Sequence, residues 1–280
     1  MKNFLLTLLI PQVIGCAIAK NPVQKELTIF PGEIRFVEFE ETGDKIRFYC
    51  KDQEIKLNRS GKKLQAVVIE SYFSELKPFT CYLKDKDQNL QELFFRVVER
   101  EYKSEQLRVN PKRIKLSAKD QKRANAEQAV LNKIYASSLG TFQFDKAFMK
   151  PMDSFITSIY GTRRVYNNIK KGQHLGTDFR AAIGEKVPAT NSGKVVLAAD
   201  LFFTGWTVII DHGLDIFSVY GHLSKTLVKE GDMVERGQVV ALSGNTGRTS
   251  GPHLHWGVKV QGQYIDGMVL IDESQKIFKE

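Results

Sequence analysis

The chain has 280 residues, enough for about two domains that each bury a core. With 42% hydrophobic and 26% charged residues, its composition excludes wholesale disorder, a collagen and a small disulfide scaffold, and the spread of charge excludes a protein with many membrane spans. The net charge of +9 suggests an anionic partner, which composition alone does not identify.

The N-terminus has the features of an export signal. Lys2 provides a positive start, and residues 4–15 are nearly all apolar, a run too short to span a bilayer but typical of a signal peptide. Ala17–Ala19 is a small-residue cleavage site, which predicts a signal peptide at residues 1–19 and a soluble product. Val13–Cys16 resembles a bacterial lipobox, which would leave Cys16 lipidated and anchored to a membrane. Both interpretations predict an exported protein of the periplasm or cell envelope. The alternative is an uncleaved anchor or a core helix.

Export affects the interpretation of the three cysteines. Removal or lipidation of Cys16 leaves Cys50 and Cys81, which could form a disulfide in an oxidising compartment. Such a bridge would stabilise the fold by about 3–4 kcal/mol on the chain-entropy model. Two unpaired thiols within strands are the alternative, and the sequence leaves both open. There is no CxxC pair, which argues against a zinc ribbon or a thioredoxin-type site.

Residues 20–100 are predicted to form a small β-rich accessory domain. Hydrophobic and polar residues alternate there in short runs separated by turn signals such as Pro31–Gly32, a pattern typical of a small sandwich or barrel. The sequence leaves two roles open for this domain: it could contact the cell wall, or it could be a simple spacer. The strands are expected at residues 34–39, 45–49, 64–69 and 93–98.

Residues 101–150 are predicted to be a basic helical connector. Ser117 can cap a helix from Ala118 to about Ala136, and the frequent Ala, Gln, Lys and Glu in this stretch favour a helix. Its apolar face, with Val130 and Ile134, is weak. Residues 151–272 are predicted to be a second β-rich domain, followed by a tail at 273–280. The strands of this domain are expected at residues 187–198, 206–211, 216–223 and 239–242.

All five histidines lie in the second half of the chain, and four of them occur in short patterned contexts. His174 and Asp178 are four residues apart and could converge only if the chain bends between them. His253 and His255 follow Pro252, a strand start, and their i, i+2 spacing places both on one face. His222 ends an apolar strand.

Imidazole nitrogens and carboxylate oxygens are suitable zinc ligands, and catalytic zinc sites usually have three protein ligands and an open position. These residues therefore indicate a metal site. Histidines satisfied at strand ends are the alternative. The HExxH helix of the zincin peptidases is absent, so that fold is not indicated. Spacing alone does not separate the metal ligands from the histidines that would transfer protons.

Three motifs resemble the signature motifs of the lysostaphin/LytM-type zinc endopeptidases: Gly172–Asp178, Tyr220–Leu223 and Gly251–His255. Their order and separation match as well, over about residues 150–270. The resemblance implies a mainly β fold with an antiparallel catalytic sheet. It does not extend to residues 20–100.

The resemblance also implies the roles of five residues. His174, Asp178 and His255 would bind one zinc ion, and His222 and His253 would be the catalytic pair beside it. The substrate class would be the peptide cross-links of peptidoglycan. A non-catalytic relative that binds the wall and activates other wall hydrolases is the alternative. Because all five residues are retained, the enzyme is favoured.

His212 lies in a turn and is predicted to be structural, and the glycine-rich loop of residues 244–251 is predicted either to shape the groove wall or to be an ordinary turn. Residues 151–280 contain 14 Lys and Arg against 13 Asp and Glu, so nearly all of the net charge of +9 lies in the first half. That half either helps to hold the protein to an anionic wall or membrane surface or includes a solvated basic helix. No nucleic-acid-binding module is recognisable. The oligomeric state is not predicted.

Overall fold

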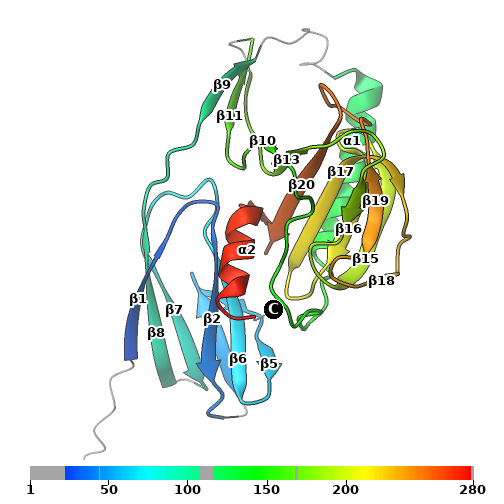
Figure 1. Ribbon diagram of the computed structural model, residues 1–280. Helices are drawn as coiled ribbons and strands as arrows, with labels where there is room; N and C mark the ends of the chain where they lie inside the picture. Colours follow the sequence, from blue (N-terminus) through cyan, green and yellow to red (C-terminus); the bar gives the residue numbers. More distant parts are fainter. Residues whose placement is uncertain (1–22, 44, 87, 108–115, 168–169, 279–280) are drawn as a thin grey trace, which may run out of the picture.

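The computed structural model describes residues 23–43, 45–86, 88–107, 116–167 and 170–278 (Figure 1). It confirms the predicted fold class, because antiparallel sheets dominate it and the described residues form two helices. The predicted signal peptide and Cys16 lie outside these residues. Within the described part of the chain, neither helix is long and apolar enough to cross a membrane.

The first β-rich region is a sandwich of two sheets. Val37, Phe39 and Leu64 of the smaller sheet pack in one core with Phe48 and Phe95 of the larger one. This confirms the sandwich rather than the barrel. The larger sheet has the order β1-β8-β7-β3-β4 and the smaller one β2-β6-β5. The strands are β1 (Val23–Ile29), β2 (Ile34–Glu40), β3 (Ile46–Cys50), β4 (Gln53–Ile55), β5 (Asn58–Ser60), β6 (Lys63–Ile69), β7 (Phe79–Asp85) and β8 (Gln88–Val97).

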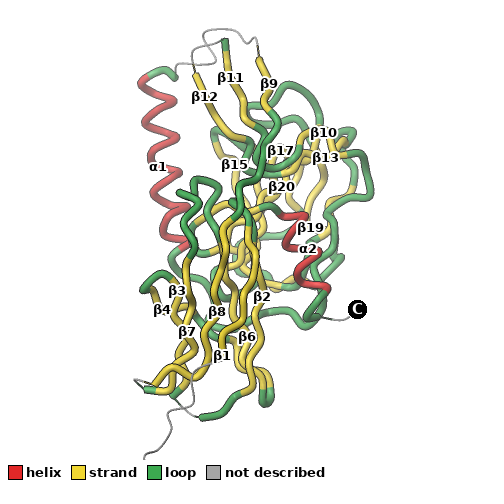
Figure 2. Tube along the Cα trace, turned by 90° about the vertical axis from the view of Figure 1, so that its left-hand side faces the viewer, coloured by secondary structure: helices red, strands yellow, loops and turns green. Residues whose placement is uncertain are grey.

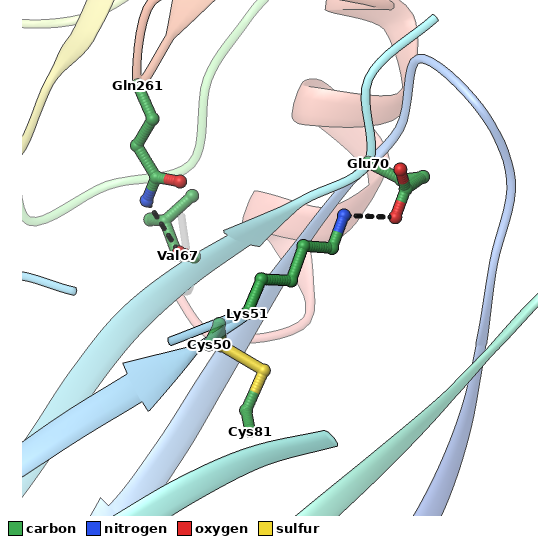
Figure 3. Close-up of a disulfide and its surroundings, with 6 residues drawn as sticks. All are labelled: Cys50, Lys51, Val67, Glu70, Cys81 and Gln261. Carbon is green, nitrogen blue, oxygen red and sulfur yellow. Dashed lines mark hydrogen bonds and ion pairs between the residues drawn. A yellow bond between two sulfur atoms is a disulfide. The ribbon is translucent and has the colours of Figure 1, made fainter. Parts of the chain in front are cut away.

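A disulfide joins Cys50 of β3 to Cys81 of β7, which are directly opposite in the strand register (Figure 3). Of the two alternatives, the structure therefore shows the disulfide and not two free thiols. Close to it, Lys51 Nζ lies 2.6 Å from Glu70 Oε2, which links the end of β3 to the end of β6. Gln261, from the second half of the chain, donates a hydrogen bond of 2.8 Å to the Val67 carbonyl oxygen. The sandwich therefore contacts the second β-rich region directly.

The second region is built on a ten-stranded sheet with the path β10-β13-β20-β17-β16-β15-β18. The strand expected at residues 187–198 is instead two strands, because residues 189–192 leave the extended path and β14 pairs with β19 while β15 pairs with β16. The strands are β10 (Ile156–Ser158), β13 (Thr177–Arg180), β14 (Lys186–Pro188), β15 (Gly193–Leu201), β16 (Gly205–Asp211), β17 (Ile216–Thr226), β18 (Met233–Val234), β19 (Val239–Ser243), β20 (His253–Val260) and β21 (Gln263–Ile265).

A separate small sheet, which the sequence did not predict, stands at one end of this region. Its strands are β9 (Ser104–Leu107), β11 (Arg163–Tyr166) and β12 (Lys170–Gln173), with β11 in the centre. β9 belongs to the predicted connector, so this stretch of the connector adds a strand to the second region.

The connector helix α1 (Ala118–Tyr135) begins where the sequence predicted, with the Ser117 side chain accepting a hydrogen bond of 3.1 Å from the Asp120 amide. It packs weakly, as expected: Ala124 and Tyr135 are its buried residues, and Val130 is exposed. The second helix, α2 (Gly267–Gln275), was not predicted and lies on a different side of the molecule (Figure 2).

The C-terminal segment is part of the core rather than a tail. α2 extends to Gln275, and Phe278 is buried against Phe36 of β2 with ring centroids 5.6 Å apart. Ile34, Phe36 and Val67 of the sandwich belong to the same buried cluster as residues of the ten-stranded sheet. The two β-rich regions therefore share a core. The domain boundaries expected at residues 100, 150 and 272 remain predictions.

Candidate metal and catalytic site

Strand pairing aligns the residues of two predicted motifs. Asp178 on β13 lies directly opposite His255 on β20, and His255 lies directly opposite Gly221 on β17. Residues opposite each other in a sheet share a face, as do residues two apart on a strand. Asp178, His253 and His255 therefore project from the same face at the same end of the sheet.

His174 joins them because the chain bends between β12 and β13, as convergence of the first motif requires. β12 ends at Gln173 and β13 begins at Thr177. The His174 Nε2 atom lies 3.0 Å from Asp178 Oδ1 and 3.2 Å from His255 Nδ1. His255 Nδ1 is 2.8 Å from the same Asp178 oxygen. All three predicted metal ligands thus converge on one point, with their ligand atoms within 4.8 Å of one another.

The donor atoms of this cluster fit a zinc ion. Bonds of about 2.0–2.1 Å from a tetrahedral zinc ion place two ligand atoms roughly 3.3 Å apart, close to the separations found. The tautomer of His174 fits as well. Its Nδ1 lies 3.1 Å from the Ile159 carbonyl oxygen, which only accepts, so Nδ1 carries the proton and Nε2 offers a lone pair. That lone pair points toward a carboxylate, an arrangement that a bound cation would satisfy.

Gly176 leaves the space that this cluster needs. A Cβ atom at this position would lie 2.4 Å from Cε1 and 2.7 Å from Nε2 of the His255 ring. The glycine of the first motif therefore allows the imidazole of the third motif to approach the backbone.

His222 reaches the site through a β-bulge. In the pairing of β16 with β17, Trp206 is opposite Leu223 and Val208 is opposite Tyr220, so Gly221 and His222 together face one residue. His222 has a φ of 59°, the left-handed region that favours glycine. Bulges of this kind redirect side chains next to active sites. Regular alternation would have pointed His222 away from the face that carries His255, whereas the bulge places their ring centroids 6.0 Å apart.

The rings of His222 and His253 lie side by side, with centroids 4.7 Å apart. His222 Nδ1 is 2.8 Å from the Thr246 carbonyl oxygen, and His253 Nδ1 is 2.9 Å from that of Gly251. Because carbonyl oxygens only accept, each Nδ1 carries a proton, which leaves each Nε2 available for proton transfer. His253 Nε2 is 3.6 Å from Asp178 Oδ1, so this pair adjoins the metal cluster. Both carbonyls belong to the glycine-rich loop, which therefore fixes the tautomers of the pair.

Burial and hydrogen bonding set the charge of the site. Burial alone would raise the pKa of Asp178, but without a metal ion the adjoining ring nitrogens of His174 and His255 outweigh this effect and hold that pKa well below its usual range. Burial lowers the pKa of His255, although Asp178 opposes the shift. Burial lowers the pKa of His222 to about 4, against a partial opposing effect of its bond to Thr246. The site thus combines an ionised carboxylate with a histidine that is neutral at pH 7.

Two residues behind the cluster were missed by the sequence reasoning. Ser158 Oγ lies 3.1 Å from His174 Nδ1, and Arg164 of β11 donates to that hydroxyl oxygen at 2.8 Å. The same Arg164 nitrogen is 3.7 Å from Asp178 Oδ2. Arg164 therefore supports two of the three ligands. The signal that could have found it is its place in the strand that pairs with the stretch leading to His174.

His212 takes no part in the cluster. It is fully buried, and its ring nitrogens lie 2.7 Å from the Ser192 carbonyl oxygen and 2.8 Å from Ser218 Oγ. This environment agrees with the structural role predicted for it.

Residues 172–267 match the model of Peptidase family M23. The curated relatives include the peptidoglycan DD-endopeptidase ShyA of Vibrio cholerae, 42% identical over 127 residues, which are 44% of this chain and 30% of ShyA. Lysostaphin of Staphylococcus simulans is 42% identical over 90 residues, 31% of this chain and 18% of lysostaphin. The chain thus spans less than a third of the length of either relative.

One solved structure resembles nearly the whole chain. It is a crystal structure of a Pseudomonas aeruginosa protein assigned to peptidase M23, with a TM-score of 0.68 and 29% sequence identity. The match covers 91% of this chain and 97% of that one. The sandwich, the connector and the second β-rich region therefore recur together in another protein.

Proposed function

We propose, from the match of residues 172–267 to peptidase family M23, that the chain is a zinc-dependent endopeptidase that hydrolyses peptide cross-links of bacterial peptidoglycan. The observation that carries the proposal is the convergence of His174, Asp178 and His255 on one point, with two further histidines beside it. A bound zinc ion supplies two things in such a site: it lowers the pKa of water from 15.7 to about 7 and it polarises a carbonyl group.

The residues of this chain divide into two roles. His174 Nε2, Asp178 Oδ1 and His255 Nδ1 would hold the metal, which matches the three protein ligands usual in catalytic zinc sites. His222 and His253 handle protons through their Nε2 atoms. At pH 7 His222 is neutral because its pKa is about 4, so it can accept a proton from the attacking water. His253 then hydrogen-bonds the developing oxyanion or protonates the leaving amine, or the two exchange these roles.

The proposed substrate class is supported by the relatives. ShyA is a peptidoglycan DD-endopeptidase and is 42% identical to this chain over 127 residues. The cluster lies within residues 172–267, which match peptidase family M23. We further propose that the protein is exported and acts at the periplasm or cell envelope, where this substrate lies, and that Cys16 would anchor it to a membrane if lipidated. The basic first half would strengthen attachment to an anionic wall or membrane surface.

The test combines metal content with product analysis. We expect about one zinc ion per purified chain, and we expect cross-linked muropeptide dimers of defined structure to be cut into monomers that mass spectrometry identifies. Protein that binds no zinc stoichiometrically and leaves the dimers intact would contradict the proposal. It would favour a non-catalytic relative that binds the wall and activates other hydrolases.

A further inference from the structure

The turn between β15 and β16 supports the backbone of His222. The His222 amide donates a hydrogen bond of 2.6 Å to the Thr204 carbonyl oxygen in this turn. That bond falls at the bulge, where His222 is left-handed. The position of Thr204 therefore helps to determine where the His222 ring lies.

The same turn is locked to the loop that holds the His222 ring. The Trp206 amide donates to Thr246 Oγ1 at 2.9 Å, and the Arg248 amide donates to the Phe203 carbonyl oxygen at 2.9 Å. A Cβ atom on Gly205 would lie 2.2 Å from Thr246 Oγ1, so the two backbones are in close contact. Since the Thr246 carbonyl accepts from His222 Nδ1, movement of the turn would affect both the backbone and the ring of His222.

Helix α1 holds this turn from outside the sheet. Glu127 Oε2 accepts a hydrogen bond of 2.8 Å from the Phe202 amide, and Glu127 Oε1 lies 2.6 Å from Arg123 Nε. Arg123 Nη2 in turn donates to the Asp200 carbonyl oxygen at 3.1 Å. The Glu127 side chain is 19% exposed, so its bond to the Phe202 amide is partly shielded from water.

These contacts are specific in a helix that otherwise packs weakly. Of the described residues of α1, Ala124 and Tyr135 are buried, and Tyr135 lies two turns beyond Glu127. The Glu127 carboxylate therefore joins α1 to the turn by accepting a hydrogen bond from the Phe202 backbone amide. Arg123 orients that carboxylate.

We propose that Glu127 is a positioning residue for catalysis: through the Phe202 amide it fixes the β15–β16 turn, and through Thr204 the turn fixes His222. The inference rests on the proposed function, in which His222 transfers protons. It gives the connector a role in turnover that is independent of surface charge. Misplacement of a reacting group by about 1 Å can lower the rate by roughly 10²-fold, even when the mutation lies far from the chemistry.

The test compares three variants of the full chain, each loaded with zinc. Glu127→Ala removes the acceptor, Glu127→Gln keeps an oxygen that can accept from the Phe202 amide, and Gln128→Ala is the matched control on the exposed part of α1. On a cross-linked muropeptide dimer, we expect kcat of Glu127→Ala to fall by roughly 10-fold with little change in KM and zinc content. Glu127→Gln should recover most of the rate, and Gln128→Ala should match the wild type.

Hydrogen exchange of the amides of Phe202 and His222 provides a readout that needs no activity. It should be faster in Glu127→Ala than in Gln128→Ala, while exchange in β20 stays unchanged. Equal exchange in these two variants would overturn the inference, as would equal kcat in an active enzyme. Failure of the wild type to cut any dimer would instead contradict the proposed function. If Glu127→Ala unfolds, Arg123→Met decides, because it removes the side chain that orients the Glu127 carboxylate. Protection of the Phe202 and His222 amides equal to the wild type in Arg123→Met would then overturn the inference.

Discussion

The two sides of the site are positioned by different means. On β13 and β20, Asp178 and His255 face each other in regular register, and every interatomic distance within the metal cluster follows from strands and one bend. On β17, His222 depends on a bulge, a left-handed backbone and carbonyl oxygens from two loops. Regular pairing is hard to displace, whereas loops and bulges move more easily. Metal binding and turnover should therefore be separable by mutation.

The largest expected effect separates the two sides directly. Asp178→Ala removes the oxygen that both His174 and His255 approach, so zinc should be lost together with activity. His222→Ala should keep about one zinc ion per chain and lower kcat by roughly 10²–10⁴-fold, the usual contribution of a general acid or base. Zinc content by atomic absorption and dimer cleavage measure the two quantities. Equal loss of metal in both variants would contradict the separation.

A smaller effect is expected from the glycine that makes room for His255. Gly176→Ala would place a Cβ atom 2.4 Å from the His255 ring and push that ligand out of line. Displacing a ligand without removing it should weaken zinc affinity by roughly 10–100-fold, the range seen when the supports of metal ligands are altered. Competition with a chromogenic chelator measures the affinity. Gly140→Ala is the control, because nothing lies within 4 Å of its Cβ position. Unchanged affinity in Gly176→Ala would show that the regular side tolerates displacement.

The same contrast explains what could be predicted from the sequence. The shared face of His253 and His255 follows from their spacing on a strand, and the ligand set followed from the resemblance of three motifs. The position of His222 could not be derived from the sequence. Regular alternation along β17 would point His222 away from His255, and no residue pattern in the sequence predicts the bulge that brings them together.

Contacts between distant segments were equally hidden. Arg164 approaches Asp178 only because β11 pairs with β12 and β9, and Glu127 approaches Phe202 only because α1 packs beside β15. Alternation predicted a small sandwich or barrel at residues 20–100. The core that this region shares with the second region depends on Phe36 and Phe278, which are far apart in sequence. Local patterns predict elements and faces, while tertiary pairing determines which side chains support the site.

A further expected effect concerns stability in acid rather than activity, and it tests whether the loop side of the site is the sensitive one. Burial lowers the pKa of both His212 and His222 to about 4, from 6.5 for the free side chain. Between pH 6.5 and 4 each of these histidines binds a proton in the unfolded chain but stays neutral in the folded chain. The free energy of unfolding therefore falls as the pH drops from about 6.5 to 4 and then levels off. For His212, which is fully buried, the shift corresponds to about 3 kcal/mol at most.

His212→Gln removes the titrating imidazole of His212 and leaves the other titratable side chains of the protein in place. The variant should be less stable than the wild type at pH 7, because it loses the packing of the ring against Phe148 and the bonds to Ser192 and Ser218. Between pH 6.5 and 4, however, its free energy of unfolding should fall less steeply. Urea unfolding at several pH values measures both slopes. An unchanged slope would mean that the acid-sensitive histidine lies on the catalytic side, where His222 is held by the loops.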